Sequence, residues 1–160
     1  MHVTEENEFI VMNPVETDPD IDANVKMEVG IENFIQLEYE IFRNKFVLDD
    51  CILGKIYFIK INIPVKSMEI ILYKKETIVN GSNKLADNTV VGKYEILDGS
   101  PNESDIIPIR MYLDCYELTP SYKLNDFDAS VEYFLKFVVI DNNDKNYFKQ
   151  QDIFLWRKTF

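Results

Sequence analysis

Apolar and polar residues alternate along two stretches in the first third of the chain. Residues 25–31 place Val25, Met27, Val29 and Ile31 on one parity, and residues 35–41 do the same with Ile35, Leu37, Tyr39 and Ile41. Successive side chains of a β-strand point to opposite faces, so this pattern predicts two half-buried strands.

The chain is expected to be organised around the apolar stretch from Cys51 to Thr77, which predicts two long strands joined by a tight connection at Lys66–Ser67. The apolar parity changes near Phe58–Ile59. A β-bulge, or a strand that leaves one sheet and joins another, produces such a change. Pro64 cannot donate a ladder hydrogen bond, so this end is expected at a sheet edge.

Further strands are predicted at residues 90–97, 106–113, 131–141 and 147–158, with polar loops at 80–88 and 116–126. Pro108 suggests that one of these strands lies at an edge. No segment has helical periodicity. The pattern therefore predicts an all-β, immunoglobulin-like antiparallel β-sandwich of seven to eight strands.

The domain organisation follows from a change in composition near the start. Residues 1–22 are polar and acidic and include Pro14 and Pro19, which indicates a linker. Residues 23–160 are expected to form the sandwich.

The net charge of −11 argues against nucleic acid or anionic lipid as a direct partner. No apolar run is long enough to span a bilayer, and no secretory signal pattern precedes the first strand. Cys51 and Cys115 are therefore expected to be reduced, buried thiols of a cytosolic protein. The alternative is a secreted immunoglobulin-like adhesion domain, which would need a disulfide between them.

The chain offers little for catalysis, metal binding or cofactor binding. His2 is its single histidine, so no serine or cysteine can be paired with a histidine inside a folded site. The turn at Asp141–Asp144 resembles the start of a calcium loop, but Asn146 stands where such a loop needs glycine. We therefore expect no catalytic, metal or cofactor site, and a binding function.

Several blocks of the chain, taken in order, resemble one family. They are Val25–Asn33, Gly54–Phe58, Lys93–Gly99, Ile107–Arg110, Tyr116–Pro120, Tyr147–Gln151 and Leu155–Lys158. Together they are similar to the C-terminal half of the vacuolar protein sorting 26 family, the arrestin-like subunit of the retromer coat. The loop from Thr77 to Asn88 departs from the family pattern.

The resemblance implies two arrestin-like sandwiches in tandem, of which this chain resembles the second, so residues 1–22 would include the tail of the interdomain connection. It also implies a cytoplasmic protein, peripheral on the endosome membrane, that recycles transmembrane cargo. The implied partners are the helical-solenoid subunit, vacuolar protein sorting 35, together with sorting nexins and cargo sorting motifs. Another arrestin-like adaptor with different partners is the remaining alternative.

The resemblance assigns the contact with the solenoid subunit to Glu95, Ile96, Leu97, Asp98 and Gly99. Adjacent residues of a regular strand point to opposite faces, so Ile96 and Leu97 cannot both enter the core if pairing stays regular. At least one is then expected to be exposed. The resemblance assigns a groove shared by cargo and a sorting nexin to Val29 and Phe148, and the parity of Phe148 puts it on a face of polar residues.

Overall fold

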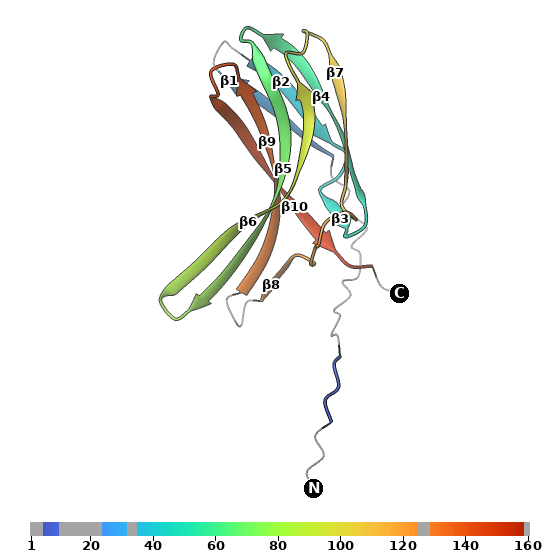
Figure 1. Ribbon diagram of the computed structural model, residues 1–160, viewed down its shortest axis with the longest axis vertical. Helices are drawn as coiled ribbons and strands as arrows, with labels where there is room; N and C mark the ends of the chain where they lie inside the picture. The colour runs from blue at the N-terminus through green and yellow to red at the C-terminus, as the bar shows by residue number, and fades with distance from the viewer. Residues whose placement is uncertain (1–4, 10–23, 32–34, 125–128, 159–160) are drawn as a thin grey trace.

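The computed structural model describes residues 5–9, 24–31, 35–124 and 129–158, and these residues contain ten strands and no helix (Figure 1). The first five strands are β1 (Val25–Ile31), β2 (Ile35–Ile41), β3 (Lys45–Val47), β4 (Cys51–Ile61) and β5 (Val65–Asn80). The remaining strands are β6 (Asn83–Asp98), β7 (Ile106–Tyr112), β8 (Tyr122–Leu124), β9 (Ala129–Asp141) and β10 (Asn146–Trp156).

The strands form two sheets that face each other. One has the order β1-β2-β4-β7, and the other has the order β3-β10-β9-β5-β6 with β8 paired to β9. Every pairing is antiparallel except that between β10 and β3, which is parallel. The predicted all-β sandwich is thus confirmed, with ten strands where seven to eight were expected.

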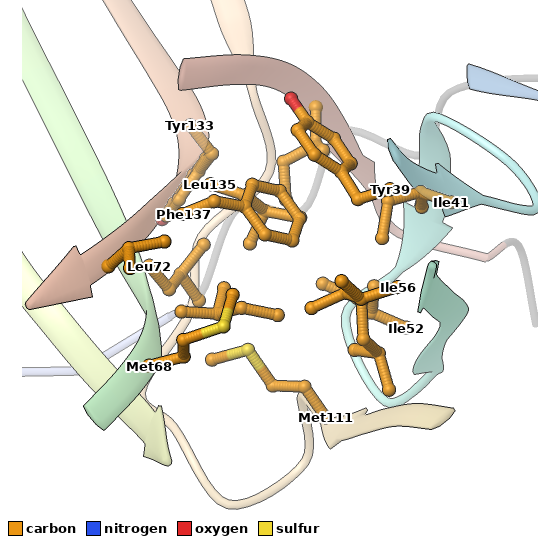
Figure 2. Packing of buried hydrophobic residues seen from close by; sticks show 14 of the residues in the cluster. Tyr39, Ile41, Ile52, Ile56, Met68, Leu72, Met111, Tyr133, Leu135 and Phe137 are labelled. Carbon is orange, nitrogen blue, oxygen red and sulfur yellow. The ribbon is translucent and has the colours of Figure 1, made fainter. Parts of the chain in front are cut away.

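Apolar side chains of the two inner faces fill the space between the sheets (Figure 2). Tyr39, Ile41, Ile52, Ile56 and Met111 come from the first sheet, and Met68, Leu72, Tyr133, Leu135 and Phe137 come from the second. All ten are buried, and the rings of Tyr39 and Phe137 stack across the interface at a centroid distance of 3.8 Å. Burial of alternate residues on each strand therefore accounts for the observed layers.

The stretch from Cys51 to Thr77 does not form the predicted hairpin. β4 belongs to the first sheet and β5 to the second, so the chain crosses between layers over residues 62–64 and not at Lys66–Ser67. Pro64 lies in this crossing, where its missing N–H interrupts no ladder. Both strands are rich in apolar residues, and apolarity alone does not distinguish pairing within a sheet from packing across a sandwich.

The change of parity near Phe58–Ile59 has the first of the two predicted causes, a β-bulge. Leu37 pairs with Phe58 and Gln36 with Lys60, so Ile59 is the extra residue of a β-bulge. Its side chain is exposed, whereas that of Phe58 is buried.

The segment predicted as a loop at residues 80–88 is mostly strand. β5 and β6 form a long hairpin closed at Gly81–Ser82, and its outer end extends beyond the sandwich (Figure 1). Gly81 adopts φ +62°, which suits glycine in a tight turn. Every residue from 81 to 90 is exposed. A strand with no buried face has no apolar alternation, and the sequence pattern therefore predicted a loop.

Other expectations concern the ends and the irregular parts of the chain. The expected loop at 116–126 contains the short strand β8, and β7, which carries Pro108, is an edge strand as predicted. Residues 5–9 are exposed and form no strand, while most of the expected linker and His2 lie outside the described residues. The domain boundary at residue 23 stays a prediction.

A substitution at Gly54 can test how closely β4 and β2 approach each other in the first sheet. A Cβ at this position would collide with the carbonyl oxygen of Glu40 and lie 2.8 Å from Cδ1 of Ile41. We expect Gly54→Ala to lower the free energy of unfolding by about 1–3 kcal/mol, measured by urea denaturation. Gly30→Ala is the control, because a Cβ there meets nothing within 4 Å. Equal unfolding midpoints for the two variants would contradict the close approach of these strands.

Candidate functional site

The segment from Glu95 to Gly99 ends β6 and begins the connection to β7. Glu95 and Asp98 are exposed, whereas Ile96 and Leu97 are both half-buried and contact the hydrophobic core. The expectation that at least one of these two apolar residues is exposed is therefore wrong. Glu69 pairs with Glu95 and Met68 with Leu97, so Ile96 is the extra residue of a bulge. The bulge breaks the strict alternation and turns both side chains partly inward.

The connection that follows β6 is fixed by hydrogen bonds to the start of β5. The Gly99 amide donates to the Lys66 carbonyl at 2.7 Å, and Gly99 adopts φ +101°, a region that favours glycine. The Ser100 hydroxyl accepts from the Val65 amide at 2.8 Å and donates to the Val65 carbonyl at 2.9 Å. Further on, the Ser104 amide donates to the Phe58 carbonyl at 2.7 Å. This connection is consequently held to both sheets.

Val29 and Phe148 lie on strands at the same side of the sandwich. β2 stacks on β9 through Tyr39 and Phe137, and β7 contacts β6, so β1 lies over β10. Val29 is half-buried and packs against the core. Phe148 has 59 % of its surface exposed on the outer face of the second sheet, which is the polar face that its parity predicted. Val29 therefore points toward the core, whereas Phe148 points away from it.

The residues that surround Phe148 were not predicted from the sequence. The Lys136 ammonium lies 4.0 Å from the centre of the Phe148 ring and 5.8 Å from that of Tyr73. Tyr73 in turn stacks on Phe134 at 5.2 Å. Lys136 is the one lysine within the apolar strand β9, and that interruption was the available signal.

A cluster of polar side chains lies on the outer face of the first sheet, around the buried carboxylate of Glu40. The Asn24 amide donates to it at 2.6 Å, the Tyr57 hydroxyl donates at 3.3 Å, and the ammoniums of Lys26 and Lys55 each lie 3.6 Å away. The Asn24 hydrogen bond is the main cause that lowers the pKa of Glu40, and the two lysines lower it further against the effect of burial. The cluster is internally satisfied and is a structural feature.

A hollow of about 520 Å³ lies where the neighbour of β9 changes from β10 to β8. Its lining includes Lys75, Tyr122, Glu132, Phe134 and Phe154. None of the predicted site residues lines it, but its lining also includes Gln150 on β10, the strand that carries Phe148.

Cys51 and Cys115 are free thiols, which removes the disulfide that a secreted adhesion domain would need. Cys51 is half-buried, but Cys115 is exposed, contrary to expectation. Among the described residues, no group of three or more His, Cys, Asp or Glu side chains is arranged to hold a metal ion. The same part of the chain contains no helix long and apolar enough to cross a membrane.

The two facing sheets define an arrestin-like β-sandwich. A crystal structure of the sporulation control protein Spo0M from Bacillus subtilis superposes with a TM-score of 0.60, covering 79 % of this chain and 50 % of that one. The two sequences are 10 % identical, so the likeness concerns the fold alone.

Sequence comparison identifies the family. Residues 1–144 match the family described as vacuolar protein sorting-associated protein 26. Vacuolar protein sorting-associated protein 26B of Homo sapiens is 44 % identical over 149 residues, covering 93 % of this chain and 44 % of that protein. Vacuolar protein sorting-associated protein 26 of Plasmodium falciparum is 41 % identical over 157 residues, covering 98 % and 52 %. The chain belongs to this family and spans about half the length of these relatives.

The Glu40 cluster predicts a pH-dependent contribution to stability. Folding lowers the pKa of Glu40. Its ionised carboxylate therefore contributes fully to stability at pH values above its pKa in the unfolded chain, about 4.3. This contribution is lost as the pH falls through the lower pKa of the folded state. We expect Glu40→Gln to lower the urea midpoint at pH 7, with a smaller difference from wild type at pH 3.

Glu38→Gln serves as the control on the same strand and face, since Glu38 has no ion pair among the described residues. An equal loss at both pH values for Glu40→Gln would argue against the charge as the source of the effect.

Proposed function

We propose that this chain is the C-terminal sandwich of a non-enzymatic retromer coat subunit. In this role it sorts transmembrane cargo at endosomes, as a peripheral protein on the cytoplasmic side of the membrane. Membership of a family named for vacuolar protein sorting is the observation that carries the proposal. The fold supports it, because an arrestin-like sandwich offers sheet edges and strand connections to partners.

The end of β6 is the proposed contact for the helical-solenoid subunit, vacuolar protein sorting 35. Ile96 and Leu97 keep part of their apolar surface accessible between the exposed carboxylates of Glu95 and Asp98. A bulge and a hydrogen-bonded connection hold this segment in place. A surface that is already ordered loses less conformational entropy on binding, which favours affinity.

The edge formed by β10 is the proposed site for a cargo motif together with a sorting nexin. Phe148 presents an apolar ring next to strand residues that are paired on one side only. An extended peptide could add to this edge through main-chain hydrogen bonds and use Phe148 and Val29 for specificity.

The β6 contact is tested with Ile96→Asp combined with Leu97→Asn, assayed by titration calorimetry against the first helices of the solenoid subunit. We expect a loss of about 1–4 kcal/mol of binding free energy, as for an apolar anchor at an interface centre. Because both side chains also touch the core, some loss of stability is expected, and circular dichroism must establish that the variant is folded.

The matched control is Ile78→Asp with Leu85→Asn, which places the same substitutions on an exposed cross-strand pair of the β5–β6 hairpin. A second variant, Glu95→Lys with Asp98→Lys, alters only exposed residues and should weaken binding without loss of stability. Unchanged affinity in both folded β6 variants would refute the contact.

Phe148→Ala tests the peptide site. More than half of this side chain is exposed, so we expect little change in stability. We expect at least a tenfold weaker affinity for a peptide with an aromatic-plus-aliphatic sorting motif, measured by fluorescence anisotropy on the assembly with the solenoid subunit and a sorting nexin. Tyr112→Ala is the control, because Tyr112 is also 59 % exposed but lies on the edge strand of the other sheet. Equal losses in the two variants would speak against a specific site.

A further inference from the structure

Lys136 occupies an unusual position for a lysine on a sheet face. It is half-buried on β9, and its ammonium lies over the Phe148 ring on β10 with Tyr73 of β5 on its other side. The distance of 4.0 Å to the Phe148 ring centre is well within the range of a cation–π contact. Lys136 thus connects the exposed Phe148 to the aromatic pair of Tyr73 and Phe134.

No carboxylate neutralises this ammonium within the described part of the chain. Lys136 takes part in none of the ion pairs formed among the described residues. Its cross-strand neighbours are Gln150 on β10 and Ile71 on β5, and the nearby Glu69 is paired with Lys93 at 3.7 Å. In a chain with a net charge of −11, the apolar ring proposed to take a peptide is therefore accompanied by an unpaired positive charge.

The register of β10 shows where a bound peptide would meet this charge. β10 pairs with β9 over Asn146–Ile153, and β3 covers its other edge only from Phe154 onward. Among the described residues, the edge beside Phe148 and Gln150 has no partner strand. A peptide added there would project alternate side chains to the outer face, and Lys136 lies directly across from Gln150.

We propose that Lys136 is a specificity-determining residue of the peptide site at Phe148. The site then takes extended peptides in which an acidic residue lies two positions outside the aromatic-plus-aliphatic motif. A residue two positions away points to the same face as the motif residue from which it is counted, whereas a residue one position away points to the opposite face. This inference rests on the proposed function of Phe148 and adds the charge of the ligand to it.

The experiment compares five peptides with the same motif on the assembly of this chain with the solenoid subunit and a sorting nexin. Four carry a single glutamate one or two positions before the aromatic residue, or one or two positions after the aliphatic residue. The fifth carries glutamine at these positions. Fluorescence anisotropy at low ionic strength should show about two- to fivefold tighter binding for at least one peptide with glutamate two positions away, as for a partly exposed ion pair.

Three variants of the chain separate charge from structure. Lys136→Gln should remove the advantage of that glutamate, and Lys136→Glu should turn it into a disadvantage that a lysine at the same peptide position relieves. Lys123→Gln, an exposed lysine on the short strand β8, should leave the advantage intact. Raising the ionic strength should reduce the advantage, because salt screens exposed charges.

The outcomes distinguish the two levels of the proposal. Equal affinity of the acidic and neutral peptides, with binding still dependent on Phe148, overturns the role of Lys136 and leaves the peptide site standing. An advantage that survives Lys136→Gln also overturns it. Failure of every peptide to bind the wild-type assembly overturns the peptide site itself, and the role of Lys136 with it.

Discussion

The rest of the structure depends on the packing of the two sheets against each other through their inner faces. Its centre is the stack of Tyr39 on Phe137, in which both rings are buried and β2 is held over β9. An aromatic pair of this kind contributes about 0.5–1.5 kcal/mol beyond the area that it buries. The Tyr39 hydroxyl donates to the sulfur of Met27 at 2.9 Å, and burial raises the pKa of this phenol. The strands that form the two facing layers turn their apolar parity toward this interface, and their other parity faces outward.

Two bulges show how the fold departs from strict alternation where alternation would conflict with the core. At Ile59 the extra residue allows Phe58 to stay buried while the following residues change face. At Ile96 the extra residue brings two consecutive apolar side chains partly inward. The second bulge lies next to a connection held by hydrogen bonds from Gly99 and Ser100. These contacts hold the end of β6 to the start of β5.

Two lysines illustrate how a similar local arrangement serves different purposes. Lys55 lies 5.2 Å from the Tyr57 ring centre and 5.6 Å from that of Phe42, and it also pairs with the buried carboxylate of Glu40. Its charge is therefore neutralised within the sheet. Lys136 has aromatic neighbours as well, but no carboxylate partner in the described part of the chain. The charge of Lys55 is thus balanced within its sheet, whereas that of Lys136 has no such partner among the described residues.

The sequence by itself determined the fold class, the strands β1 and β2, the change of parity after Phe58 and the exposed position of Phe148, because each follows from the parity of side chains along the strands. Its ordered motifs also indicated the family. Only the tertiary structure decided that β4 and β5 lie in different sheets, that the segment after Thr77 continues as a strand, and that Ile96 and Leu97 both turn toward the core. It also brought Lys136, Phe148 and Tyr73 together from three strands. These features depend on which strands are neighbours, and neighbours in a β-sandwich are set by contacts between residues far apart in the chain.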